Sequence, residues 1–568
     1  MLYLSAGLKH KIWLTIACTR TAKCRARNER RILLPVLRNV ECVEKVGESI
    51  SKPQGSILSR NPMATFKPCN ENQLIMLPIS LQDQLVPGTL EHTIRRVVDK
   101  HIDLSVFDAR YHNDETGTAA IHPKILLKVI LLAYARGMLS SRQIERACRE
   151  NILFIALSYG YPPDHSTIAA FISSMQAEIE SLFCNVLLVC QGLDLLGGTH
   201  FALDGVKLSA NVSKEWSGTF DELKRKREKL QEKLQQVMAD HLQADQQPEV
   251  EVERQRKRER RLQVQMERLN EFLAQNEPKR GSGGKEIQSN AVDNDSVKMP
   301  TAHGIIQGYN AQALVDSKHQ IIVAAEAFAS QDHENLAPML RGAKKNLTAI
   351  GQDETYFGGK QLTADSNYHA LHSLTVCQNE KLDAYLPDIR FRTRDPRFAE
   401  RERFKDGIHG RQRTAAKPDI FALSDFSFDR AAQTYLCPNG KRLTLHARNQ
   451  INRSRTYDVY HARPEDCAAC PLRARCLSKP TAARRYLSVP TPQPPNLIDE
   501  MQAKIDSPPG RKIYAQRLRI VEPVFAKICF HKRMSRFTFR IKPKVDVQWR
   551  LYAIVRNIGK IQAFGILK

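Results

Sequence analysis

The sequence predicts an α/β fold, a mixed sheet with flanking helices, preceded by an all-α region. Helical periodicity fills the chain from about Leu90 to Leu193. An apolar strand carrying Asp204 follows, and after it come a charged helical segment, a run of strands and a helix. A further strand ends at Asp365. Strands and helices in this order favour one layered α/β domain with a helical insertion.

Length and charge limit what the protein can be. A chain of 568 residues is long enough for about two to four units with ordinary cores. Its 86 Lys and Arg against 61 Asp and Glu give a net charge of +25, which favours a polyanionic partner such as nucleic acid. The longest apolar runs, such as 125–135, are interrupted by a lysine and suit a buried helix. Thirteen scattered cysteines favour a reducing, cytoplasmic compartment over a secreted scaffold.

The first 62 residues differ from the rest of the chain. They have no sustained periodicity and make a poor signal peptide. We interpret Met1 to Pro62 as a non-native extension translated through a misplaced start codon, because the chain from Met63 onward looks like an ordinary start. The alternative is a disordered basic arm that holds phosphates, since twelve Lys and Arg against four Glu give the segment a charge of +8.

Residues 63–195 are expected to form a helical domain. Short helices joined by turns, with Arg142, Arg146 and Arg149 together on SRQIERACREN, fit a helix-turn-helix that reads DNA. A plain helical bundle explains the same pattern.

Asp204 lies in THFALDGVKLSAN, where the periodicity changes from helical to extended. An Asp-Gly pair is usually a hairpin turn, so a structural role is the simpler interpretation of this motif alone. The alternative is a functional acid at the end of the strand.

Residues 220–279 are predicted to form a charged helical hairpin. Leucines at three- and four-residue spacing provide a packing seam in both arms, and Pro248 lies in the break between them. After the linker at Gly281, the segments SVKMP, GIIQGYNAQALVD and QIIVAAEAFA have extended patterns. Asp332, in ASQDHENLAPML, is interpreted as a cap of the following helix.

Asp365 in LTADSNYHALHSL resembles Asp204 in position, because it follows an apolar strand and precedes a helix. Catalytic residues gather at strand ends of open α/β sheets. Asp365 or Ser366 could also cap the following helix. A strand with an Asp, a helical insertion, further strands, a helix and a second strand with an Asp is the layout of an RNase H-like sheet.

Four cysteines form a candidate metal site. They have the spacing C-x-x-C with two further thiols within reach, which predicts a closed, structural Zn²⁺ site. Four reduced thiols in a loop or an iron-sulfur cluster are the alternatives. The residues are Cys437, Cys467, Cys470 and Cys476.

Glu522 is an isolated acid in a basic segment. Eleven Lys and Arg lie between Asp506 and Asp546, and Glu522 is the only acid among them. Together with Asp204 and Asp365 it could hold Mg²⁺ or Mn²⁺, since hard carboxylate oxygens suit these ions and two such ions can activate an attacking oxygen and stabilise a leaving one. The basic surroundings would hold DNA phosphates.

These segments together resemble the DDE transposases of bacterial insertion sequences. The resemblance runs from about Phe66 to the C-terminus and rests on FALDGVKLSAN, EIQSNAVDNDSVKM, GIIQGYNAQALVD, LTADSNY, the cysteine cluster, YAQRLRIVEPVFAKI and RFTFRIKPKVDVQWRLYAIVRNIGKI. It implies that Asp204, Asp365 and Glu522 are the catalytic, metal-binding triad of an RNase H-like domain. That domain would span residues 196–560, with the helical hairpin insertion at 220–279 and a small insertion carrying the four cysteines at about 430–480.

The resemblance also implies the partners. The helical region would recognise the terminal inverted repeats of the element, and the protein would act on double-stranded DNA, as a homodimer in the complex, in the bacterial cytoplasm at the nucleoid. Related proteins carry Tyr, Arg and Lys around the catalytic Glu, and Tyr514 and Arg517 match the first two. The usual Lys position holds Cys529, with Lys527 and Lys532 on either side.

Two other functions fit the same residues. A metal-dependent nuclease would cut DNA without joining it, and a transposase-derived DNA-binding protein would bind it without cutting. Damaged motifs would mark the second, whereas all three acids are present.

Overall fold

The structure is a computed structural model that describes residues 80–111, 120–242, 249–281, 284–302, 304–398, 420–452, 455–479, 481–491 and 496–565. These residues belong to one compact unit, Pro78–Lys568. The segment Met1–Pro62 lies outside the described residues.

Helices alone form the first part of this unit, as the periodicity predicts. The helix α5 begins where Asp164 accepts hydrogen bonds from the backbone N–H groups of Ser166 and Thr167. The helix α2 ends before Gly137, whose φ of +71° suits a glycine. The helices are α1 (Leu90–Lys100), η1 (Ser105–Arg110), α2 (Pro123–Ala135), α3 (Ser141–Glu150), α4 (Ile152–Leu157), α5 (His165–Ser173) and α6 (Ile179–Gly192).

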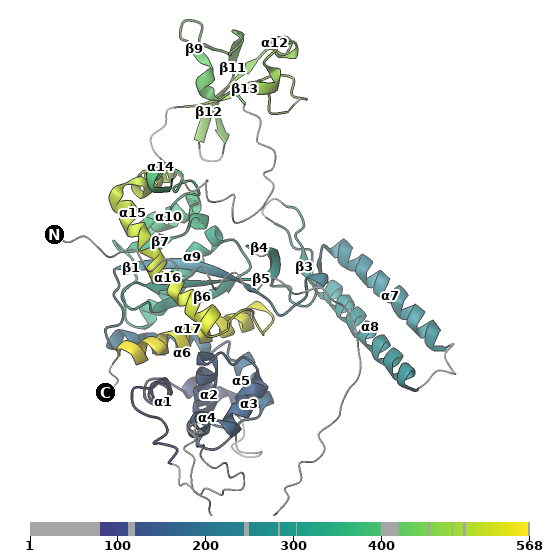
Figure 1. Cartoon of the computed structure of the whole chain (residues 1–568), viewed down its shortest axis with the longest axis vertical. Helices are drawn as coiled ribbons and strands as arrows, with labels where there is room; N and C mark the ends of the chain where they lie inside the picture. Colours follow the sequence, from purple (N-terminus) through teal and green to yellow (C-terminus); the bar gives the residue numbers. More distant parts are fainter. Residues whose placement is uncertain are drawn as a thin grey trace, which may run out of the picture. The chain divides into compact units, whose positions relative to one another are not determined.

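A six-stranded mixed sheet lies at the centre of the fold (Figure 1). The strand β5 pairs antiparallel with β1 along one edge and with β4 and β6 along the other, while β1, β7 and β8 run parallel. The strands are β1 (His200–Ser209), β4 (Val297–Thr301), β5 (Gly304–Asp316), β6 (Ile322–Phe328), β7 (Gln361–Ala364) and β8 (Asp383–Tyr385). The three extended runs after Gly281 are therefore confirmed as β4, β5 and β6. The hairpin-turn interpretation of Asp204 is wrong, because Asp204 and Gly205 lie inside β1.

The helices that cover the sheet come from the second half of the chain. The 23-residue helix α17 packs against β6 and also against α2 and α6, and Tyr552 on α17 contacts Tyr134 on α2 with ring centroids 5.1 Å apart. The N-terminal helices and the sheet therefore share one hydrophobic core. The helices in this half of the chain, outside the cysteine segment, are α9 (Asp332–Ala349), η3 (Ser366–Tyr368), α10 (Leu371–Asn379), η4 (Pro396–Phe398), α14 (Leu497–Asp506), α15 (Pro508–Ala515), α16 (Arg517–Ala526), η6, a π-helix (Lys527–His531), and α17 (Lys542–Phe564).

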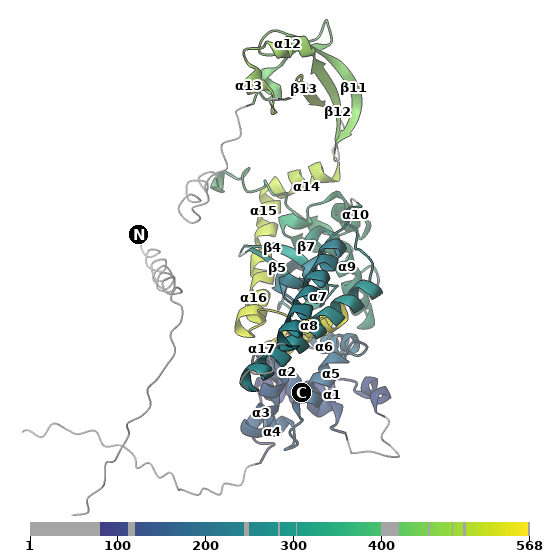
Figure 2. The ribbon, with the colours of Figure 1, turned by 90° about the vertical axis from the view of Figure 1, so that its right-hand side faces the viewer.

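The charged hairpin is confirmed as α7 (Phe220–Leu242) and α8 (Glu249–Gln275), which lie side by side (Figure 2). Its base has a small core of its own, in which Leu223 and Leu269 are buried with Phe220 and Phe272. The short elements η2 (Lys214–Trp216), β2 (Ser217–Gly218) and β3 (Ser289–Asn290) connect the hairpin to the sheet.

The cysteine segment forms a separate antiparallel sheet in the order β13-β12-β11-β10-β9. Its small core includes Phe426, Leu443 and Leu487. The elements are η5 (Leu423–Asp425), β9 (Ser427–Asp429), β10 (Thr434–Leu436), β11 (Arg442–Asn452), β12 (Arg455–Ala462), α12 (Pro464–Ala468), α13 (Arg473–Cys476) and β13 (Tyr486–Pro490). Among the residues that the structure describes, no helix is both long and apolar enough to cross a membrane.

Candidate active site

Asp204 and Asp365 lie next to each other on neighbouring strands. The strands β1 and β7 run parallel, and their last paired residues are Leu203 and Ala364. The next residue on each strand is the aspartate, so both carboxyl groups stand where the pairing ends. Asp204 and Asp365 therefore lie side by side where the parallel pairing of β1 and β7 ends, although β1 itself continues past Asp204 to Ser209. Their role as metal ligands stays a prediction. Asp365 also accepts a hydrogen bond from the backbone N–H of Asn367 at 2.9 Å, which caps the short helix η3 rather than α10.

Arg517 is the cation of this site. Its guanidinium Nη2 lies 2.7 Å from Oδ2 of Asp204, and the Arg517 side chain is 9% exposed. The Nε of Arg517 is buried and has no hydrogen-bond partner within the described part of the chain. Arg517 was predicted to contact DNA, and here it faces the acids from the first turn of α16.

Crowding and burial raise the pKa values of both acids. Burial raises the pKa of Asp204 to about 6, with Arg517 opposing the shift and Asp365 adding to it. Burial likewise raises the pKa of Asp365, against the backbone N–H of Asn367 and the charge of Arg517. A divalent cation would remove this penalty, because it favours the ionised form of both groups.

Asp332 is a third carboxylate at the same place. Its Oδ1 accepts hydrogen bonds from the side-chain amides of Asn310 at 2.7 Å and Gln312 at 2.8 Å. The Nδ2 of Asn367 donates to Oδ2 of Asp332 at 3.1 Å and to Oδ2 of Asp365 at 3.3 Å, so one amide bridges the two acids. Asp332 is also close enough to Asp204 to raise its pKa.

The interpretation of Asp332 as a helix cap is wrong. Gln331 occupies the N-cap of α9, and Asp332 is the first residue of the helix, with its side chain turned to the amides of β5. A signal was present in the sequence, since Asn310 and Gln312 are polar residues two apart in the buried part of a largely apolar strand. Such alternation places both on one face of the sheet.

Glu522 has a different position. It lies on α16, whose buried residues are Arg517, Ile520, Val521 and Val524, and its side chain is exposed. The Glu522 side chain makes no hydrogen bond or ion pair with the residues the structure describes. Its membership of the metal site stays a prediction.

The remaining predicted DNA contacts lie in three places: beside the acids, at the π-helical turn after α16, and on α3. Tyr514 is half-buried near the acids, with its ring 5.2 Å from that of Phe391. Lys527 and Lys532 lie at the two ends of the π-helical turn, where Lys527 is exposed and Lys532 half-buried. Arg142 and Arg146 are exposed on α3.

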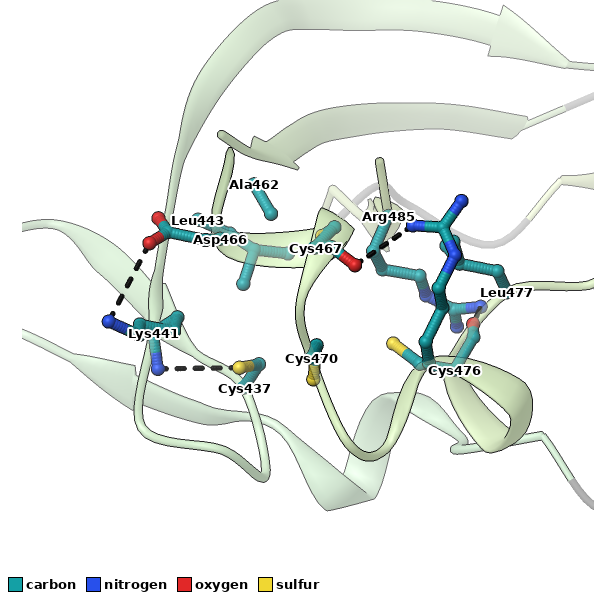
Figure 3. Close-up of a pocket in the computed structure, with 11 residues that line it drawn as sticks. Cys437, Lys441, Leu443, Ala462, Asp466, Cys467, Cys470, Cys476, Leu477 and Arg485 are labelled. Atoms are coloured by element: carbon teal, nitrogen blue, oxygen red, sulfur yellow. Dashed lines mark hydrogen bonds and ion pairs between the residues drawn. The ribbon is translucent and has the colours of Figure 1, made fainter. Parts of the chain in front are cut away.

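The four cysteines meet in the small sheet unit (Figure 3). They line one cavity of about 20 Å³, with Cys437 in the β10–β11 turn and the others on α12, on α13 and between them. All four are free thiols. Burial raises the pKa of the Cys476 thiol, and the nearness of the three other thiols adds to this. The backbone N–H of Lys441 lies 3.3 Å from Sγ of Cys437.

Neither site is arranged around a metal ion as it stands. Within the described ranges, no group of three or more His, Cys, Asp or Glu side chains is placed so that it could hold one. The donor chemistry nevertheless fits the expected ions. Asp204 and Asp365 offer hard oxygens for Mg²⁺ or Mn²⁺, and the cavity between the four thiols has room for about one small ion.

Two family models match the chain. One, described as Transposase DDE domain, covers residues 436–562, and the other, described as Transposase domain (DUF772), covers residues 80–174. These two matches support a DDE transposase of an insertion sequence. No curated protein matches it. The first match includes Glu522, Tyr514 and the four cysteines of this transposase, and the second includes Arg142 and Arg146. Asp204 and Asp365 lie outside both ranges, so their assignment rests on the sheet geometry described above.

Proposed function

We propose that this transposase binds the terminal inverted repeats of its element and catalyses metal-dependent DNA cleavage and strand transfer. The observation that carries the proposal is the convergence of Asp204 and Asp365 on adjacent parallel strands, with raised pKa values and one guanidinium beside them. An RNase H-like identity of the sheet accords with the order of β1, β5, β6, α9 and β7.

In this proposal Asp204, Asp365 and Glu522 hold Mg²⁺ or Mn²⁺. The ion, when bound, activates the attacking oxygen and stabilises the leaving one. Asp204 and Asp365 would supply ligands from the sheet, and Arg517 balances part of their charge. Glu522 would supply a third ligand from α16.

DNA would contact Tyr514, Arg517, Lys527 and Lys532 near the site and Arg142 and Arg146 on α3, which serves as part of a helix-turn-helix domain. A homodimer would bring two element ends together, in the cytoplasm at the nucleoid. The four cysteines would hold one structural Zn²⁺, which stabilises the small sheet without taking part in the reaction.

The test uses a labelled duplex that ends in the terminal repeat, with Mg²⁺ and a target plasmid. We expect cleavage at the repeat end and covalent joining to the plasmid. Cleavage without joining would favour a metal-dependent nuclease, and binding without cleavage would favour a DNA-binding protein derived from a transposase.

A further inference from the structure

Two cations of α17, Arg556 and Lys560, bind one amide on the side of the helix that faces the π-helical turn. Arg556 Nη2 and Lys560 Nζ donate to the same oxygen, Oε1 of Gln320, at 2.9 and 3.0 Å. The Nε2 of Gln320 donates to the backbone carbonyl of Arg519 at 2.8 Å, which fixes the amide with its oxygen toward the two cations. Two positive groups therefore share one neutral acceptor.

The π-helical turn brings two further lysines to this place. Residues 552, 556 and 560 recur every four positions, so they lie on one face of α17. The Tyr552 hydroxyl donates to the carbonyl of Lys532 at 3.1 Å, and the N–H of Lys532 donates to the carbonyl of Lys527 at 3.0 Å. We call Lys527, Lys532, Arg556 and Lys560 the cationic cluster.

Among the residues that the structure describes, no acid pairs with the cationic cluster. Burial and neighbouring cations lower the pKa of Lys532 and of Lys560 to about 8, and burial lowers the pKa of Arg556 to about 10. None of the four forms an ion pair within the part of the chain that the structure describes. Arg556 is 7% exposed, and its Nε is buried without a hydrogen-bond partner in the same residues.

Unbalanced like charges destabilise a fold, and Arg556 adds the cost of burying a charge. A phosphate group would relieve both costs, since it carries negative charge and several acceptor oxygens. We infer that the cationic cluster is a binding site for a phosphate of the DNA backbone, with Arg556 as its floor and Lys527, Lys532 and Lys560 around it. This rests on the proposed function and adds residues of α17 to the DNA surface.

The test replaces one lysine at a time in the full chain. Each of Lys527→Gln, Lys532→Gln and Lys560→Gln should lower the slope of log Kd against log salt concentration by about 1, because one fewer counterion is released from the duplex. Lys345→Gln is the matched control. It removes the same charge from an exposed lysine that already pairs with Glu180 at 2.6 Å, and the slope should stay unchanged.

A second readout needs no duplex. Inorganic phosphate should raise the melting temperature of the wild type and of Lys345→Gln more than that of Lys560→Gln. If Lys560→Gln does not fold, the exposed Lys527→Gln serves instead.

The outcomes separate the two proposals. A wild type that binds no duplex at any salt concentration would overturn the proposed function. A wild type that binds and cuts duplex, while all three variants keep its salt slope, would overturn the phosphate site and the DNA contacts proposed for Lys527 and Lys532, and would leave the proposed cleavage and strand transfer standing.

Discussion

The acidic site and the cationic cluster are built in the same way with opposite charges. In the acidic site the Arg517 guanidinium pairs with Asp204, and Asp332 and Asp365 lie nearby. In the cationic cluster Arg556 and Lys560 share the amide oxygen of Gln320, and Lys527 and Lys532 lie nearby. In both regions neutral amides fix the charged groups, and the excess charge is left for a group from outside. The difference predicts which partner each region would bind: a divalent cation at the acids and a phosphate at the cations, as proposed above.

The largest expected effect separates cutting from binding. Asp365→Asn should lower single-turnover cleavage of a terminal-repeat duplex by at least about a thousandfold, about 4 kcal/mol, because it removes a ligand of the metal. DNA affinity should remain, since the cationic cluster is untouched. Glu334→Gln, an exposed acid near the start of the same α9 that carries Asp332, is the control. Equal cleavage by Asp365→Asn and Glu334→Gln would contradict the role of Asp365 as a metal ligand.

The acidic site should set a lower pH limit for the cleavage rate, and the cationic cluster should set an upper pH limit for DNA affinity. At saturating DNA and subsaturating Mg²⁺, cleavage should fall below about pH 6, where a proton on Asp204 competes with the metal, by about tenfold per pH unit. DNA affinity should fall above about pH 8, where Lys532 and Lys560 lose their charge. A cleavage rate that is flat between pH 5 and 7 would contradict the first limit.

The same pKa shifts determine whether the free energy of unfolding rises or falls with pH. Asp204 binds its proton more tightly in the folded chain than at the ordinary pKa of 3.8, so the free energy of unfolding should fall as pH rises from about 4 to 6. For Lys532 and Lys560 the unfolded chain, with a pKa of 10.5, binds more protons. Their contribution therefore makes the free energy of unfolding rise between about pH 8 and 10.5.

A smaller effect is expected at Asp332. In Asp332→Asn the negative charge beside Asp204 is lost, so the pKa of Asp204 should fall and the acidic limb of the cleavage profile should move to lower pH, by less than about one unit. The measurement is the cleavage rate between pH 4.5 and 7.5. An unmoved limb would show that Asp332 does not act on Asp204.

Replacing a cysteine of the four-cysteine cluster should have the smallest effect on the acidic site and on the cationic cluster. Cys470→Ser should lower zinc content from about one ion per chain and lower the melting temperature, while a chain that remains folded cuts DNA at nearly the wild-type rate. Cys184→Ser, a free thiol outside the cluster, should keep its zinc. Wild-type protein without bound metal and with full stability would overturn the zinc site.

The sequence predicts the parts of the fold that depend on local patterns. The hairpin follows from leucine spacing. The meeting of Asp204 with Asp365 is predicted only in part, because Asp365 follows the end of β7 whereas Asp204 lies inside β1. Asp332 could not be assigned in this way, because its role depends on amides of β5 that lie twenty residues or more away. Arg556 and Lys560 were missed because their meeting with Lys532 depends on how α17 packs against the π-helical turn.

The most direct test of the central claim concerns Glu522, the predicted ligand that the sheet does not position. Single-turnover cleavage of a labelled terminal-repeat duplex in Mg²⁺ is compared between the wild type and Glu522→Gln at matched DNA occupancy. We predict that Glu522→Gln binds the duplex as well as the wild type and does not cut it, because the metal loses its third carboxylate. Near-wild-type cleavage by Glu522→Gln, with Asp204→Asn and Asp365→Asn inactive, would contradict the account and place the third ligand elsewhere.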